Sequence, residues 1–373
     1  RGGLRHVHHP GHEGGGGPAV SASRNTLIIL SYFVKQTETF VHSLQRSDDT
    51  IYCDLEGRES LPAFDQEFGV KSHQTTIKRT VSCKGTGLHS GVDAELTLRP
   101  APAGHGIVFR RVDVAGDDAL VPARFDLVGS AAYGTTLRNA AGVEVRTVEH
   151  LMAALAAAGV DNVLAEIDGI EIPIMDGSSA DFVALIEAAG LQPQAATRHY
   201  IRIRRPVEVI DGDKIARLTP HDGFQIDCDI VFEAAAIARQ RFVFEVAGET
   251  FKTEVARART FTLARDIEAL HAHGLALGGS LDNAVVVDGG EILNPDGLRF
   301  ADECVRHKAL DVLGDLALAG KPILGRFEGV KMGHAMNNKV LRALFADPSA
   351  YDIVPAGAGR GEVVKLPVAA SPM

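Results

Sequence analysis

The sequence predicts an α+β fold with two similarly built domains, each a mostly antiparallel sheet with helices on one face, and the two helix layers packed against each other between the sheets. Two observations favour this fold. Beyond residue 75, short runs of apolar and β-branched residues alternate with turn residues. Within that stretch, residues 148–167 and 305–327 both have the order helix, glycine, strand. Chance similarity between two common helix–strand units is the alternative.

Composition limits the classes of protein that the chain can belong to. Of its 373 residues, 45% are hydrophobic and 23% charged, which is typical of a globular protein with room for two domains. The net charge of -10 argues against nucleic acid as a partner. Four scattered cysteines without a CxxC pair argue against a disulfide framework and favour a cytoplasmic location. The apolar run at 27–34 is too short for a transmembrane segment.

Residues 1–74 differ in composition from the rest of the chain. The first 22 residues are rich in glycine and histidine, and Gly14 to Gly17 follow one another. Such a segment buries too little apolar surface to fold, so we expect 1–74 to be an atypical N-terminal extension that is largely disordered. Adventitious metal binding by the histidines, and a regulatory or partner-binding extension, are alternatives.

The first domain is expected over residues 75–195. The Ala-rich run 149–158 favours a helix strongly and ends at Gly159, which suits a helix C-terminus. A second helix runs to Gly190, with Ser178 or Ser179 as its cap. Residues 191–199 contain Gln, Pro and Thr without periodicity and are interpreted as a linker. The expected strands of this domain are 76–81, 94–98, 107–111, 143–148 and 163–167.

The second domain is expected over residues 196–348, followed by a C-terminal tail at 349–373. Its expected strands are 200–203, 207–210, 215–218, 224–232, 242–246, 284–287 and 323–327. Its expected helices are 263–273, 302–319 and 337–345.

Residues 305–316 carry a polar stripe on a predicted helix. His307 and Asp311 are four residues apart and therefore lie on one face, and Asp315 extends the stripe by one turn. An imidazole and a carboxylate in this arrangement are two of the three protein ligands of a catalytic zinc. The alternative is a surface stripe on an ordinary amphipathic helix.

Glu149 and His150 supply what that site lacks. His150 is a possible third ligand, and Glu149 is a free carboxylate that can take a proton from water. The two histidine-bearing helices meet if the helix layers face each other. His334, among small and amide residues near a helix start, can act as the acid for a leaving group; a surface or helix-capping histidine is the alternative.

Six motifs occur together in this chain and in one order. They are 147–151 (TVEHL), 172–178 (IPIMDGS), 257–261 (RARTF), 277–280 (LGGS), 305–311 (VRHKALD) and 333–339 (GHAMNNK). Together they resemble the UDP-3-O-acyl-N-acetylglucosamine deacetylase family of zinc amidases in lipid A synthesis. The resemblance covers most of the chain, from about residue 75 to 345, and leaves out 1–72.

The resemblance implies roles for seven residues at the reacting centre. By position, they are His150, His307 and Asp311 as Zn²⁺ ligands, Glu149 as general base, His334 as the acid that protonates the amine, Asp315 as the charged neighbour that keeps His334 cationic, and Thr260 as the hydroxyl that stabilises the oxyanion.

The resemblance also implies substrate contacts. Lys308 and Lys214 match basic residues at the sugar-nucleotide site, and Phe232 matches an aromatic residue there. The insertion 261–288 resembles the family's apolar acyl channel, to which Phe261, Ile267, Ser280 and Val286 are assigned. Core packing is the alternative for many apolar residues of this insertion.

Two departures from the family pattern concern the substrate rather than the reaction. Thr262 replaces a usual glycine beside the channel mouth, and residues 234–236 replace a His-Pro turn.

The expected function is therefore zinc-dependent removal of acetate from the 2-acetamido group of a UDP-sugar lipid, by a cytoplasmic monomer. A catalytically inactive protein that still binds the sugar nucleotide is the alternative. The presence of Glu149, Thr260 and His334 argues against it.

Overall fold

The computed structural model describes residues 50–52 and 71–357, all within one compact unit. The predicted disordered extension therefore lies mostly outside the described residues, as does the part of the tail beyond 357. Two short segments of these regions are strands: β1 (Thr50–Tyr52) pairs with β3, and β21 (Tyr351–Pro355) pairs with β12. Residues 351–355 thus belong to a sheet, although the sequence placed them in a tail.

The first large sheet contains six strands in the order β1-β3-β4-β10-β5-β6. Its pairs are antiparallel except β1 with β3 and β10 with β5. The bounds not yet given are β3 (Thr80–Thr86), β4 (Asp93–Pro100), β5 (Ile107–Arg111), β6 (Leu120–Pro122) and β10 (Val163–Ile167). A small sheet beside it contains β7 (Val128–Ser130), β8 (Thr136–Arg138) and β9 (Glu144–Val145).

The second large sheet contains seven strands. Five follow the order β13-β14-β20-β12-β21, and β15, which also pairs with β20, carries β16. Their bounds are β12 (His199–Ile203), β13 (Val207–Asp211), β14 (Lys214–Thr219), β15 (Phe224–Val231), β16 (Arg239–Glu245) and β20 (Ile323–Val330).

The predicted linker at 191–199 was wrong. Leu191–Thr197 forms β11, which pairs antiparallel with β2 (His73–Ile77), and β12 follows directly. The pairing partner lies in a distant part of the sequence. A period-2 pattern is weak when both faces of a strand are partly exposed, so local composition did not indicate this strand.

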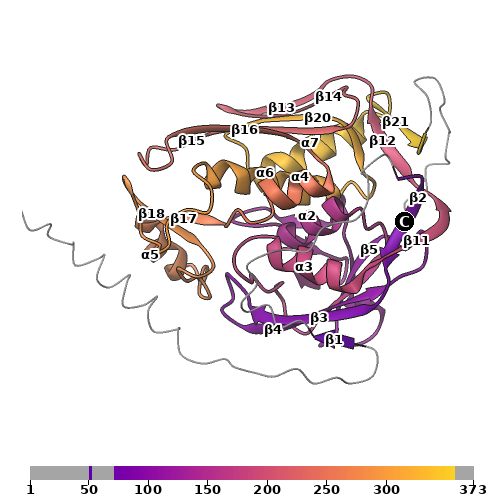
Figure 1. Ribbon diagram of the computed structural model, residues 1–373, viewed down its shortest axis with the longest axis horizontal. Helices are drawn as coiled ribbons and strands as arrows, with labels where there is room; N and C mark the ends of the chain where they lie inside the picture. Colours follow the sequence, from indigo (N-terminus) through magenta and orange to yellow (C-terminus); the bar gives the residue numbers. More distant parts are fainter. Residues whose placement is uncertain (1–49, 53–70, 358–373) are drawn as a thin grey trace, which may run out of the picture. The chain divides into compact units, whose positions relative to one another are not determined.

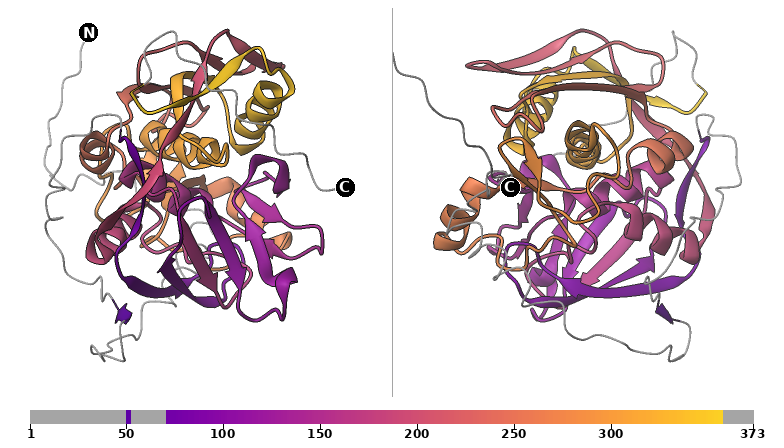
Figure 2. Two further views of the ribbon diagram at one scale, coloured as in Figure 1. Left: turned by 90° about the vertical axis from the view of Figure 1, so that its right-hand side faces the viewer. Right: turned by 60° about the vertical axis from the view of Figure 1, so that its left-hand side comes forward.

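Helices lie on the facing sides of the two large sheets. α2 (Glu149–Ala158) and α3 (Ala180–Ala189) belong to the first half, and α6 (Glu303–Ala317) and α7 (His334–Ala346) to the second. Figure 1 shows the helices as inner layers between the sheets, and the views in Figure 2 keep this order. The predicted α+β fold with packed helix layers is therefore confirmed.

The other helices in the described part of the chain are short. α4 (Gly248–Glu254) lies beside α6, α5 (Ala264–Ala272) belongs to the insertion, and the 3-10 helices are Asp117–Ala119 and Phe125–Leu127. In the insertion, α5 follows β17 (Phe261–Leu263), which pairs with β18 (Val285–Asp288), and β18 pairs with β19 (Glu291–Ile292). Within the described ranges, no helix has the length and apolar character needed to cross a membrane.

The two halves approach each other closely at the crossing of α2 and α6. At Gly314, an added Cβ atom would lie only 2.0 Å from the carbonyl oxygen of Glu149. Because glycine has no Cβ, the α6 backbone can approach the first turn of α2. This approach places the residues on either side of Gly314 in α6 next to the first residues of α2.

Candidate metal centre and active site

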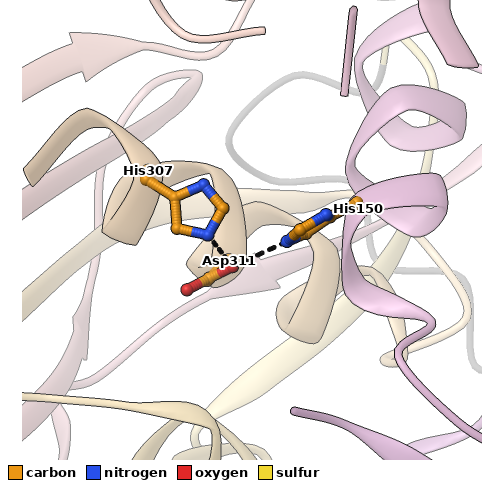
Figure 3. A group of neighbouring side chains, drawn as sticks. All are labelled: His150, His307 and Asp311. Carbon is orange, nitrogen blue, oxygen red and sulfur yellow. Dashed lines mark ion pairs between the residues drawn. The ribbon is translucent and has the colours of Figure 1, made fainter. Parts of the chain in front are cut away.

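Three buried side chains from α2 and α6 can hold a metal ion. The ligand atoms of His150, His307 and Asp311 lie within 4.8 Å of one another. The Nε2 atoms of His307 and His150 lie 3.3 and 3.7 Å from Asp311 Oδ1. Figure 3 shows His150 entering from one helix and the other two residues from the second.

The protonation of this group favours a bound cation. Burial lowers the pKa of His307, and it lowers that of His150 to about 3, so both imidazoles are neutral at pH 7. His307 Nδ1 donates to the Ala258 carbonyl at 3.0 Å, which leaves Nε2 as an acceptor that faces the carboxylate. Among the described residues, Asp311 Oδ1 has no hydrogen-bond partner. Acceptors that face one another in a buried site fit a shared cation.

Asp311 supplies the negative charge of this group. Burial opposes its ionisation, but the neighbouring His307, Lys308 and His334 outweigh burial and hold its pKa well below the usual range. Lys308 Nζ donates to Asp311 Oδ2 at 2.8 Å, while Oδ1 faces the histidines. The two oxygens of Asp311 therefore have different roles.

Glu149 lies beside the three candidate metal ligands His150, His307 and Asp311, here called the metal group, and is not one of them. Its side chain is almost fully buried, and desolvation raises its pKa to about 7 against the opposing effect of His334. Its Oε2 accepts the backbone N–H of Thr135 at 3.0 Å, and its Oε1 lies 3.8 Å from His334 Nε2. A carboxyl group with a pKa near 7 is suited to accept a proton at neutral pH.

His334 is the first residue of α7, which begins three residues earlier than the predicted helix at 337–345. Its Nδ1 donates to Asp315 Oδ2 at 2.9 Å, and this bond leaves Nε2 directed at Glu149 and Asp311. Burial opposes the charged form, but Asp315, Asp311 and Glu149 raise the pKa of His334 to about 9. His334 is therefore a cation at neutral pH.

The chain enters α2 through a strained residue. Thr147 has a φ of 55°, which is unusual for a β-branched residue. Its hydroxyl donates to the buried carboxylate of Glu171 at 2.8 Å, and Glu171 also accepts the backbone N–H groups of His89 and Ser90. This network holds the strained turn before Glu149 and His150, and no local pattern of residues indicated it.

Thr260 reaches the same site from the insertion side. A buried ion pair between Arg259 and Glu303, at 2.9 Å, fixes the preceding residue to the start of α6. The backbone N–H of Thr260 donates to the Gly177 carbonyl at 2.8 Å. Thr260 lines the same pocket as the metal group.

The pocket over the metal group has a volume of about 350 Å³. Among the predicted substrate contacts, it is lined by Lys214, Lys308 and Phe261. Tyr133 and Lys331 also line it, and the sequence did not indicate either of them. All of the predicted reacting residues except Asp315 line this pocket, and Asp315 contacts it through His334.

A second pocket of about 450 Å³ opens beside the insertion. Phe232 and Phe261, whose rings meet edge to face, line it together with Tyr133, Lys308 and Thr262. Thr262, the departure from the family pattern, therefore contributes to this wall. Further apolar lining comes from Leu263, Ala269, Leu270 and Leu275.

Three residues assigned to the channel do not line either of these pockets. Ile267 and Val286 are buried where α5 and β18 pack together, and Ser280 lies in a turn in which its N–H donates to Asn283. An apolar period does not distinguish the face of a helix that meets the core from the face that lines a pocket. Core packing, the alternative stated for this insertion, describes Ile267 and Val286.

Comparisons with known proteins agree with the motifs. Residues 74–346 match the family model described as LpxC: UDP-3-O-acyl N-acetylglycosamine deacetylase. A protein named UDP-3-O-acyl-N-acetylglucosamine deacetylase from Myxococcus xanthus is 52% identical over 284 residues, covering 76% of this chain and 90% of that protein. Proteins of the same name from Anaeromyxobacter sp. and Idiomarina loihiensis are 50% and 51% identical, covering 80% and 75% of this chain and 96% and 92% of their own lengths.

Proposed function

This chain belongs to the UDP-3-O-acyl-N-acetylglucosamine deacetylase family, and we propose how its own residues perform that family's reaction. It is a hydrolase that removes acetate from the 2-acetamido group of a UDP-3-O-acyl-N-acetylglucosamine in lipid A biosynthesis. One observation carries the mechanism. A buried carboxyl group with a raised pKa and a cationic histidine lie 3.8 Å apart beside a metal-binding group.

Zn²⁺ is the ion that we assign to His150, His307 and Asp311. Two neutral imidazoles and one carboxylate form a typical catalytic zinc set, which leaves a further position open. When bound, zinc lowers the pKa of water and polarises the amide carbonyl.

Glu149 is the base in this mechanism. Its carboxylate takes the proton from the attacking water, and the backbone N–H of Thr135 keeps the Oε2 atom in place. Burial makes the carboxylate more basic than an exposed glutamate, so it accepts a proton readily near neutral pH.

His334 is the acid. Its Nδ1 is held by Asp315, so Nε2 faces the site and gives its proton to the departing amine. The three carboxylates around His334 keep it charged until that step. Thr260 directs its hydroxyl to the oxyanion of the tetrahedral intermediate. This complete set of groups argues against an inactive binding protein.

The substrate spans the two adjoining pockets in this proposal. Lys214 and Lys308 contact the diphosphate side, and the pocket lined by Phe232 and Phe261 takes the acyl chain. Ser280, Ile267 and Val286 support the insertion from outside the pocket wall.

We also propose that the protein works as a cytoplasmic monomer with domains at 75–195 and 196–348. The thiols of Cys228 and Cys304 are free and buried, which suits a reducing compartment. Light scattering on the purified chain tests the monomer, and a dimer at working concentration contradicts it.

Acetate release from UDP-3-O-acyl-N-acetylglucosamine tests the function directly. We expect turnover that stops when a chelator removes the metal and returns with stoichiometric Zn²⁺, and a preferred length within a panel of acyl chains. Turnover that survives complete metal removal contradicts the zinc assignment. Absence of acetate release from the zinc-loaded protein contradicts the mechanism.

A further inference from the structure

One residue outside the proposed catalytic set bonds to both the acid and the base sides of the site. Thr135 precedes β8 and is buried. Its backbone N–H donates to Glu149 Oε2 at 3.0 Å, and its hydroxyl donates to Asp315 Oδ1 at 2.5 Å. Its carbonyl accepts the N–H of Val148, the residue before α2, at 3.3 Å. All three polar groups of Thr135 are therefore bonded to the two helices that carry the site.

The orientation of the Asp315 carboxylate depends on its hydrogen-bond donors. Its Oδ2 atom accepts two side-chain donors, His334 Nδ1 at 2.9 Å and Asn337 Nδ2 at 2.8 Å. The Thr135 hydroxyl is the side-chain donor to Oδ1 in the described part of the chain. Two donors on one oxygen leave the carboxylate plane able to rotate, and a third donor on the other oxygen restricts that rotation. The orientation of His334 follows that of its acceptor.

The neighbouring residues keep Thr135 in position. A Cβ atom at Gly134 would lie 3.0 Å from Glu149 Oε1, so the chain passes directly against the base. The carbonyl of Tyr133 is bonded to the His89 ring at 3.0 Å. A β-branched residue is also stiff at χ1, so the hydroxyl of a threonine keeps one direction better than that of a serine.

We propose that Thr135 is a positioning residue that couples the acid to the base of this deacetylase. Its main chain orients Glu149, and its hydroxyl orients Asp315 and, through Asp315, the imidazole of His334. The inference rests on the proposed roles of Glu149 and His334. It adds that the geometry between these two residues is set by a third element, the segment that leads into β8.

Thr135→Val is the main test, because valine has nearly the same shape and keeps the backbone N–H to Glu149 while it lacks the hydroxyl. In the zinc-loaded full chain, we expect kcat for acetate release to fall about 10- to 100-fold, as for loss of a hydrogen bond to a charged group, with KM within about two-fold. Bound zinc and the melting temperature should stay close to those of the unmodified protein. Thr135→Ser, which keeps the hydroxyl, should restore kcat to within about three-fold.

Thr136→Val is a matched control, since the neighbouring threonine has no side-chain bond to Glu149 or Asp315. A kcat for Thr135→Val within about two-fold of the unmodified protein overturns the proposal, and so does an equal loss in the Ser and Val variants. If the Val variant does not fold, Thr135→Cys, a weak donor of similar size, gives the same test. Its kcat should fall, and an unchanged kcat overturns the proposal.

A double-mutant cycle with Asp315→Ala tests the route of the effect. If Thr135 acts through Asp315, adding Thr135→Val to Asp315→Ala changes kcat by no more than about two-fold, and fully multiplicative losses overturn the route. Glu149→Gln and His334→Gln separate this inference from the mechanism. Full turnover in either of them contradicts the proposed function, whereas their inactivity together with an unaffected Thr135→Val contradicts only the role of Thr135.

Discussion

The helices α2 and α6 have similar surroundings but present their chemical groups in different ways. Each is followed by a glycine with positive φ, Gly159 and Gly320, and then by a strand of its sheet. In α6 the proposed functional side chains are His307, Asp311 and Asp315, one turn apart along a single face. In α2 the proposed functional side chains are its first two residues. The regular spacing of the α6 residues indicated a site. The two α2 residues indicate a site only because they lie next to α6.

The two helices differ in what fixes the positions of these side chains. The stripe on α6 follows from helical geometry alone, because residues four apart share a face. The start of α2 is set by the strained Thr147 and by the close approach of Gly314 to the Glu149 carbonyl. The chemistry of α2 therefore depends on tertiary contacts, and that of α6 depends on them much less.

Removal of the anionic ligand on α6, Asp311, should have the largest effect on activity. Asp311→Ala deletes the one anionic ligand of the metal group, so we expect loss of bound zinc and of all measurable acetate release. Elemental analysis of the purified variant, together with the acetate assay, checks both results. Asp315→Asn, one turn along the same face, is the control, and it should keep its zinc while turnover falls. Zinc bound at full occupancy in Asp311→Ala would remove Asp311 from the ligand set.

Removal of the base on α2 should separate chemistry from metal binding. Glu149→Gln keeps the size of the side chain but takes away the proton acceptor, so kcat should fall by about 10²- to 10⁴-fold. Zinc content should remain full, since Glu149 lies outside the metal group. The variant is assayed for acetate and zinc beside Asp311→Ala. Wild-type turnover in Glu149→Gln would show that another group takes the proton.

Much of this site could be predicted from the sequence, but only the parts with a local or family pattern. The spacing of His307 and Asp311, and the motif around Glu149 and His150, indicated the metal group, which the fold brings together. The roles of Glu149 and His334 stay predictions. Gly314 and Thr135 gave no signal, because their importance lies in contacts with residues that are distant in sequence.

The same limit accounts for the wrong prediction of a linker. The strand at Leu191–Thr197 looked like a linker because its partner lies far away in the chain. Ile267 and Val286 belong to an apolar segment in which periodicity cannot separate the core from a pocket wall.

The crossing of α2 and α6 can be tested with one methyl group. In Gly314→Ala, the new Cβ would lie 2.0 Å from the Glu149 carbonyl oxygen, so the helices must move apart. We expect a loss of about 1–3 kcal/mol in the free energy of unfolding, as for overpacking, although alanine favours a helix. Displacement of Glu149 relative to the metal group should lower kcat by up to about 100-fold. Denaturant unfolding and the acetate assay measure the two effects.

Gly333→Ala provides the matched control for this variant. Gly333 is adjacent to His334, has extended backbone, and an added Cβ there would meet no atom within 4 Å. Its stability and turnover should change less than those of Gly314→Ala. Equal losses in the two variants would mean that the helix crossing has no special role.

The smallest expected effect is on the pH dependence of kcat/KM. A residue of α2 sets the acidic limb of this profile, and a residue held by α6 sets the alkaline limb. Glu149 on α2 must be ionised to accept a proton, so kcat/KM should fall as the pH drops below about 7, or below a somewhat lower value once a bound cation favours the carboxylate. His334, which is held by Asp315 of α6, must be protonated to act as an acid, so kcat/KM should also fall as the pH rises above about 9.

Asp315→Asn separates the two limbs. After burial, which acts in the opposite direction, Asp315 has the largest influence on the pKa of His334, so its neutralisation should move the alkaline limb down by about one pH unit. The acidic limb should move less, because burial is the largest cause of the raised pKa of Glu149 and Asp315 contributes less. Profiles of kcat/KM for the unmodified protein and for Asp315→Asn measure the shifts. A range of about pH 5 to 10 covers both limbs. A larger shift of the acidic limb would mean that Asp315 acts mainly on α2, and the assignment of one limb to each helix would then be wrong.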